Sequence, residues 1–203
     1  MLAYGPKENR TGVQAKDGQW RMPLPRAKFV KGETLTHWGI MVIEDPYKPI
    51  RDLPQALPEF INLVVSDASQ CGLRIGPPVN LNQPIKAKLN DLRAIESRFQ
   101  DLHSIIQTKS GPPQLIMAIC PGKGIHYDGI KRLGDCEYRM PTQFVLSKNV
   151  TKEPISPQTV HNIVIKINSK LGGVNQVLPL TFFSVSFFKR TCFSAIPVLT
   201  DSS

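Results

Sequence analysis

The chain has 203 residues, of which 41% are hydrophobic, and a formal net charge of +9. This length and apolar content are enough for one sizeable α/β domain with flanking segments. The longest apolar run, around residues 177–188, is shorter than the roughly 20 residues of a membrane-spanning helix, and the N-terminus has no apolar signal region. We therefore expect no membrane association and a cytoplasmic location, with the nucleus as a second compartment.

The positive charge is unevenly distributed along the chain. Residues 1–38 carry seven Lys and Arg against three Asp and Glu, and residues 121–178 carry eight against four, whereas residues 39–120 carry eight of each. Local positive fields favour a phosphate-bearing partner, although basic surfaces also occur in proteins that bind no nucleic acid. The charge alone therefore does not indicate a function, and a sequence motif is needed as well.

The cysteines and histidines show no ligand pattern. There is no CxxC pair, and no His at zinc-finger spacing, among Cys71, Cys120, Cys136 and Cys192. No ligand set or catalytic triad is indicated by the spacing of His37, His103, His126 and His161. We expect reduced thiols, no disulfide framework, no metal and no cofactor.

In chain order, the first predicted segment is an arm. Residues 1–36 are rich in Gly, Pro, Lys and Arg without a sustained apolar period, which predicts an extended arm, with structure beginning at Trp38. Strands are predicted at 37–43, at 73–75 and just beyond, at 114–120 and at 142–146; helical spacing of apolar residues covers 57–68 and 89–106. This alternation predicts a Rossmann-like α/β fold, with a central, mostly parallel sheet of about four strands flanked by helices.

Two further helices follow the third apolar strand. A short one is predicted at 126–133. A longer one has Ser156 as N-cap, Pro157 at its first position and Gly172-Gly173 past its end. Its buried stripe consists of Val160, Ile163, Val164, Ile167 and Leu171. Residues 179–203 change character abruptly and are expected to form a tail.

Candidate phosphate-binding residues lie on these last two helices. In an open parallel sheet, ligands bind outside the carboxyl ends of the strands, and the segment 120–131 runs there from a strand through a Gly-bearing loop into a helix. The loop is neither a Walker motif nor a GxGxxG motif. Two pairs spaced four apart, Tyr127 with Lys131 and Lys166 with Lys170, would suit a terminal phosphate and a stacked base. Spacing alone also allows, and slightly favours, separate solvated lysines on separate helices.

Several strings in this region resemble the MID domain of eukaryotic-type Argonaute proteins. They are Tyr127-Asp-Gly-Ile-Lys131, Thr142-Gln143-Phe-Val145, Lys148-Asn149-Val150 and, most specifically, NIVIKINSKLGGVNQVL at 162–178. Gly18-Gln19-Trp20-Arg21-Met22, with Lys28-Phe29 and Trp38, is similar to the second linker that precedes this domain in the family. The resemblance implies a linker arm at 1–36, a MID domain at 37–178 and, at 179–203, a tail where a PIWI domain would begin.

The resemblance also implies a function in RNA interference and gene silencing. Family members hold the 5′-terminal nucleotide of a guide RNA, with the matching tyrosine stacking on the first base. The matching phosphate-binding positions are Tyr127, Lys131, Gln143, Asn149, Lys166 and Lys170. The loop matching the one that reads the first base consists of Pro121, Gly122, Lys123, Gly124, Ile125 and His126. The implied partners are a 5′-phosphorylated siRNA- or miRNA-like guide and the PIWI and other Argonaute domains.

Two departures and two alternatives accompany the resemblance. Phe144 stands where relatives often have Cys, and two extra residues near 153–155 lengthen a loop, so we expect a changed rim around an intact pocket. The slicer carboxylates of a PIWI domain are not recognisable in the chain, which is therefore not expected to cut RNA. A nucleotide phosphohydrolase would need a carboxylate beside the phosphate, for which Asp128 and Asp135 are the near candidates. The other alternative is an interaction module or truncated competitor that binds no guide.

Overall fold

A parallel sheet of four strands forms the centre of the protein. The computed structural model describes residues 2–8, 10–14, 16–17, 27–47, 49–50, 52–122 and 124–178. The strand order is β6-β4-β7-β8, comprising β6 (Ile85–Lys88), β4 (Trp38–Glu44), β7 (Leu115–Cys120) and β8 (Thr142–Leu146), and all three pairings are parallel. The predicted Rossmann-like α/β class is confirmed.

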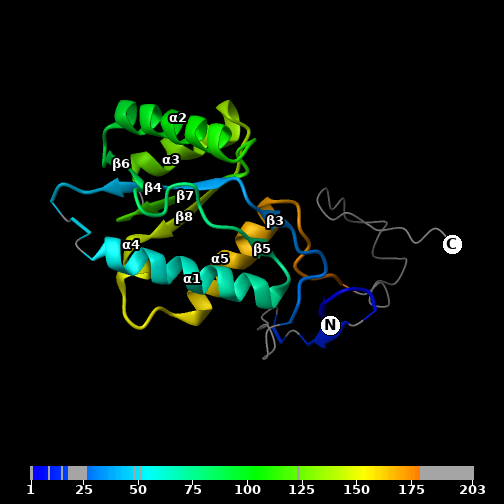
Figure 1. The fold of residues 1–203 in the computed structure, drawn as a ribbon. Coiled ribbons are helices and arrows are strands. Elements are labelled where there is room, and N and C mark those ends of the chain that lie inside the picture. Colours follow the sequence, from blue (N-terminus) through cyan, green and yellow to red (C-terminus); the bar gives the residue numbers. More distant parts are fainter. Residues whose placement is uncertain are drawn as a thin grey trace.

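Helices cover both faces of this sheet (Figure 1). One layer contains α2 (Leu92–Lys109) and α3 (Ile125–Arg132), which continues into a π-helical turn, η1 (Leu133–Glu137). The other layer contains α1 (Leu53–Cys71), the short α4 (Ser147–Thr151) and α5 (Pro157–Lys170). Placing α3 and α5 on opposite faces means that they can approach each other only around the edge strand β8.

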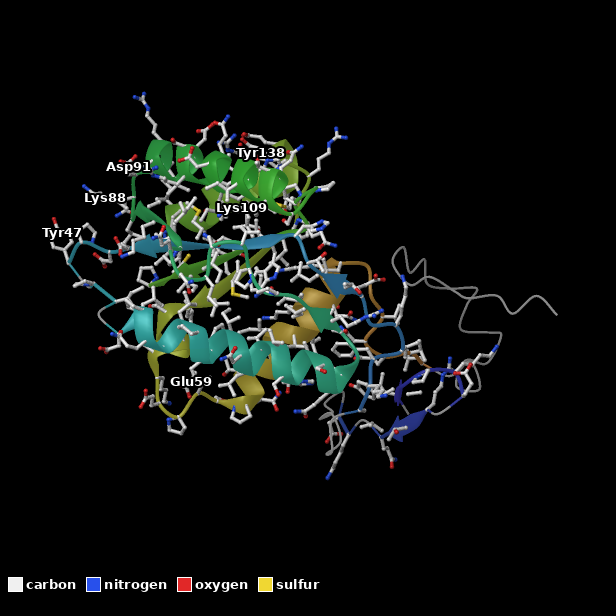
Figure 2. All side chains as sticks on the ribbon, viewed as in Figure 1. Tyr47, Glu59, Lys88, Asp91, Lys109 and Tyr138 are labelled. Atoms are coloured by element: carbon white, nitrogen blue, oxygen red, sulfur yellow. The ribbon has the colours of Figure 1, made fainter. Side chains whose placement is uncertain are left out.

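The two hydrophobic clusters follow from the alternation of side chains along the strands. One cluster packs against α1 and α5 and includes Ile40, Val42, Met117, Ile119 and Val145. The other packs against α2 and α3 and includes Met41, Ile43, Ile116 and Ala118. Since β4 and β7 are buried on both faces, their sequences are continuous apolar runs, and full burial of each large side chain contributes roughly 1.5–3 kcal/mol. Side chains fill the space between the sheet and both helical layers (Figure 2).

The helix ends match their sequence signals. The Ser156 hydroxyl accepts a hydrogen bond from the backbone N–H of Thr159 at 3.4 Å, and Pro157 opens α5, as predicted. The first long helix ends at Gly72, whose φ of 85° lies in the left-handed region that glycine adopts without strain. Leu89 precedes α2, which begins at Leu92 with Asp91 as its N-cap. These local signals therefore predicted the ends of the helices to within a few residues.

A strand forms within the predicted segment 73–75, but it lies outside the central sheet. Arg74–Ile75 forms β5, which pairs with β3 (Thr34–Leu35) in a separate two-stranded parallel sheet. The fourth strand of the central sheet is β6, which the sequence did not reveal. Its lysines, Lys86 and Lys88, are exposed at the sheet edge, so β6 lacks the apolar run that marks a buried strand.

The prediction of an extended arm also differs from the structure. Leu2–Tyr4 (β1) pairs with Thr11–Val13 (β2) in a hairpin, and Tyr4 and Phe29 are buried. Backbone hydrogen bonds join Ala3 to Val177 and Lys31 to Val174, at 2.9–3.0 Å. The described part of the arm is thus docked on the segment that follows α5. Backbone pairing with such a distant segment leaves no local apolar period for sequence reading to detect.

Some expectations fall outside the described residues. The linker-like string at 18–22 and the tail at 179–203 are among them. Among the described residues, no helix is both long and apolar enough to cross a membrane.

Candidate anion-binding site at strand β8

The centre of the candidate site is a contact between β8 and the last residue of α5. The Lys170 ammonium donates hydrogen bonds to the Gln143 side-chain oxygen at 2.6 Å and to the Thr142 carbonyl oxygen at 2.7 Å. Gln143 is buried, and its amide nitrogen donates to the Phe144 carbonyl oxygen at 2.8 Å. Both the lysine and the glutamine are therefore held in defined positions.

Two more lysines act on Lys170 electrostatically. The pKa of Lys170 is lowered to about 8, first by burial and then by the positive charges of Lys131 and Lys166, while Asp135 opposes the shift. Lys131 comes from α3 and Lys166 from α5, so the two charges act on Lys170 from helices on opposite faces of the sheet. Like charges gathered around a half-buried ammonium repel one another, and an anion between them would relieve that repulsion.

The loop before α3 follows the carboxyl end of β7, as expected, whereas the contact between Lys170 and Gln143 lies at the opposite end of a strand. Gln143 is the second residue of β8, at the amino end of this strand. Because β8 is an edge strand, side chains from α3 and α5 meet beside it rather than beyond the sheet. The site is therefore a flank of the sheet, lined by two helices.

Tyr127 makes an aromatic contact with Phe144 of strand β8. Its ring centroid lies 4.4 Å from that of Phe144, with the planes inclined by 45°. Phe144 follows Gln143 on β8 and points to the opposite face, toward the cluster under α2 and α3. The position at which relatives often have Cys thus carries a ring that supports Tyr127.

The loop before α3 is held by His126. Its Nε2 lies 3.0 Å from the Gly122 carbonyl oxygen, and the ring is 1% exposed. A Cβ at Gly124 would lie 3.0 Å from the His126 ring, so the imidazole occupies the space that a side chain there would need. Ile125 is exposed, and Lys123 lies outside the described residues. His126, which belongs to the predicted base-reading loop, therefore has a structural role that its spacing along the sequence did not indicate.

Asn149 is the predicted site residue with the weakest connection. It is half-buried on α4, directly after β8, and among the described residues no hydrogen bond or ion pair links it to the other five.

The two candidate catalytic carboxylates, Asp128 and Asp135, are both exposed. Nζ of Lys131 lies 3.8 Å from Oδ2 of Asp135, which is the distance of a weak ion pair. Neither carboxylate has the buried, oriented position typical of a catalytic base.

Sequence reading missed the residue that fixes the end of α5. Asn168 is fully buried: its Oδ1 accepts from the Glu33 N–H, and its Nδ2 donates to the Lys31 carbonyl oxygen, both at 3.0 Å, and to Asn175 at 2.9 Å. A Cβ at Gly173 would lie 2.3 Å from Asn168 Oδ1. The polar members of the string at 162–178 thus hold the helix end that carries Lys170. The signal in the sequence that could have revealed this residue was a polar side chain beside the predicted apolar stripe.

Comparisons with known proteins agree with this architecture. The family model of the Piwi domain matches residues 115–185. The crystal structure of the Arabidopsis thaliana AGO5 MID domain is 27% identical, with a TM-score of 0.54 over 74% of this chain and 99% of that one. Kluyveromyces polysporus Argonaute with a guide RNA is 18% identical, with a TM-score of 0.67 over 89% of this chain but 22% of that one. The N. crassa QDE-2 MID-PIWI structure is 18% identical, with a TM-score of 0.53 over 70% of this chain and 35% of that one.

The fold and the site define a Rossmann-like domain with a basic flank formed by two helices and an edge strand. The family-model match and the plant MID structure support an Argonaute MID-domain fragment. The resemblance seen in the sequence is confirmed. The chain spans about a fifth of the yeast Argonaute structure and about a third of the N. crassa structure.

Proposed function

We propose that this MID domain binds the 5′-phosphorylated terminal nucleotide of a small guide RNA, siRNA- or miRNA-like, in RNA silencing. The observation that carries the proposal is the convergence of Lys131, Lys166 and Lys170 beside buried Gln143. A terminal phosphate carries a charge of about −1.5 to −2 at neutral pH, whereas an internal phosphodiester carries one. A cluster of ammonium groups therefore favours an RNA end over the middle of a strand.

The contacts of Lys170 suggest how the phosphate is held. The ammonium is directed by the Thr142 carbonyl and the Gln143 amide oxygen. An incoming phosphate oxygen accepts from the remaining N–H group of Lys170 and from the ammonium groups of Lys131 and Lys166. Asn149 adds an amide donor from α4. Because Lys170 is already held in place, less side-chain entropy is lost when the phosphate binds.

We assign the stacking of the first base to the ring of Tyr127. Stacking of a base on an aromatic ring contributes roughly 1–3 kcal/mol and is tolerant of sequence, since every base has a flat face. Identity of the base is then read by the loop of Pro121, Gly122, Lys123, Gly124, Ile125 and His126. The hydrogen bond of His126 to Gly122 keeps the described part of this loop in one conformation, which such reading requires.

In this proposal the domain binds and does not catalyse, and it works beside the PIWI and other domains of an Argonaute in the cytoplasm or nucleus. Support comes from the N. crassa structure, in which a MID domain is joined to a PIWI domain, and from the yeast Argonaute structure, which contains a guide RNA. Without those neighbouring domains, affinity for the guide end should be modest.

The experiment compares one short RNA with a 5′ phosphate and the same RNA with a 5′ hydroxyl, by fluorescence anisotropy at constant salt. We expect the phosphorylated RNA to bind at least about tenfold more tightly, since charged hydrogen bonds contribute about 1.5–3 kcal/mol each. Equal affinities would overturn the proposal and leave the basic flank as a non-specific attractor on an interaction module.

A further inference from the structure

Two helices beneath the sheet bring together three side chains of the kind that bind metals. Asp67 and Cys71 are four residues apart on α1, so they lie on the same helical face, and His161 faces them from α5. Nδ1 of His161 lies 2.7 Å from Oδ2 of Asp67 and 3.8 Å from Sγ of Cys71. One ligand atom of each residue lies within 4.8 Å of the others. We call this group the Asp67–Cys71–His161 cluster.

The cluster is separate from the basic flank and is removed from solvent. Cys71 is 0% and His161 1% exposed, and the Asp67 side chain is 12% exposed. The helices α1 and α5 that carry it run side by side below the sheet (Figure 1). Spacing along the chain predicted no metal, because two ligands come from α1 and the third from α5, far along the sequence.

The distances suit a tetrahedral ion. With zinc bonds of about 2.0–2.2 Å to nitrogen and oxygen and about 2.3 Å to sulfur, ligand atoms in a tetrahedron lie roughly 3.3–3.6 Å apart. The Cys71 to His161 distance of 3.8 Å is close to that range. The shorter Asp67 to His161 distance of 2.7 Å is that of a hydrogen bond, and it widens by about 0.6 Å when a metal replaces the shared proton.

The charges also balance. A thiolate and a carboxylate carry two negative charges and a neutral imidazole adds none, so the three ligands together match the charge of a divalent cation. This matters because a buried net charge is costly unless it is paired. Mixed sulfur, nitrogen and oxygen ligands favour zinc and its close relatives over magnesium or calcium, which prefer oxygen alone.

We propose that Asp67, Cys71 and His161 form a binding site for a divalent transition cation, best suited to Zn²⁺, that joins α1 to α5. On binding, the Cys71 thiol releases its proton to solvent, and the imidazole proton moves from Nδ1 to Nε2, so that the Nδ1 lone pair faces the metal. Nε2 has no hydrogen-bond partner in the described part of the chain. Water takes the fourth position.

The test is a titration of the reduced, full chain with Co²⁺, followed by displacement with Zn²⁺. A thiolate-to-cobalt charge-transfer band and the visible bands of tetrahedral cobalt should rise to saturation at one ion per chain and vanish with Zn²⁺. Cys71→Ser should remove the charge-transfer band and weaken binding at least tenfold, since losing even an indirect supporting contact typically costs about 10–100-fold. Cys136→Ser, at an exposed thiol, is the matched control and should retain both.

Two further measurements keep the outcome decisive. Asp67→Asn keeps an oxygen near His161 while removing the anionic ligand, so it should retain the thiolate band but bind at least about tenfold more weakly. Zn²⁺ at a hundredfold excess over its Kd should raise the Tm by about 5–10 °C in the wild type and the Cys136→Ser variant, but not in Cys71→Ser.

The proposal is overturned if the folded wild type shows no thiolate band, or if Cys71→Ser shows the same band as the wild type. In the first case the Asp67–His161 hydrogen bond is only a structural link between the helices. Circular dichroism confirms that each variant is folded. The guide-end proposal does not depend on this site, so either can fail without the other.

Discussion

The Lys170 ammonium lies 2.6 Å from the side-chain oxygen of Gln143, and this hydrogen bond joins the end of α5 to the edge strand of the sheet. It is the point at which two segments of the resemblance, Thr142-Gln143-Phe-Val145 and the string at 162–178, meet in space. The amide fixes the direction of the ammonium, while Lys131 and Lys166 make its position electrostatically unfavourable without an anion.

Replacing Lys170 with Ala should weaken binding of 5′-phosphorylated RNA by about 1.5–3 kcal/mol, or roughly ten- to hundredfold, because a charged donor to the phosphate is lost. Binding of the 5′-hydroxyl RNA should change much less. Anisotropy titrations of both RNAs measure the difference. The matched control is Lys109→Ala, at an exposed lysine on α2, across the sheet from α5 (Figure 2). Equal losses for both RNAs would contradict a specific role for Lys170.

Affinity for the phosphorylated RNA should fall as the pH rises above about 8, because burial and two neighbouring lysines lower the pKa of Lys170 to about 8. A bound phosphate favours the charged ammonium, so the complex keeps this proton to higher pH than the free protein does. Below pH 8 both forms are protonated and this group adds no pH dependence; above it, affinity drops by up to about tenfold per pH unit.

Titrations at pH 7, 8 and 9 check this sign. Lys170→Arg is the control, since arginine stays charged throughout and should flatten the profile even where its absolute affinity is lower. The same decline in both proteins would show that another group titrates.

Tyr127→Ala should reduce affinity for the guide end by roughly 1–3 kcal/mol through lost stacking. Tyr127→Phe keeps the ring and should retain most of the affinity. The contrast is measured with a normal 5′-phosphorylated RNA and one whose first nucleotide lacks its base. If Ala substitution costs as much with the abasic RNA, Tyr127 does not stack on the first base.

His126→Ala should reduce differences among the four nucleoside monophosphates without removing the preference for phosphate over hydroxyl. The imidazole holds the loop through Gly122, whereas the lysines are held by β8 and α5. Chemical-shift titrations with the four mononucleotides report the base preference. A wild-type protein that responds equally to all four would already remove the reading role from the loop.

Asn168→Ala should destabilise the domain by about 2–4 kcal/mol, because the Glu33 N–H and the Lys31 carbonyl oxygen lose a buried partner. Denaturant unfolding measures the change. Asn162→Ala, at an exposed position on the same helix, should stay within about 0.5 kcal/mol of the wild type. Similar losses in both variants would mean that helix propensity, rather than the network around Asn168, is responsible.

Local patterns in the sequence were sufficient for the fold class, for strands β4, β7 and β8 and for the long helices. The apolar runs of β4 and β7 arise because both faces of these strands are buried, and Ser156, Pro157 and the glycines after α5 bound a helix through their own backbone chemistry. Periodicity and capping involve neighbours a few residues apart, so they can be read from the chain directly. The resemblance likewise supplied the six candidate ligands from short strings.

Contacts between distant segments were decided only by the tertiary structure. β6 is recognisable as a strand only from its pairing with β4, and the arm is docked only because Ala3 and Lys31 find partners at Val177 and Val174. The sequence could not show that the charges of Lys131 and Lys166 act on Lys170 at the flank of β8, nor that Asp67 and Cys71 face His161. Electrostatics and ligand geometry depend on separations in space, and folding brings these residues together from segments that the chain keeps far apart.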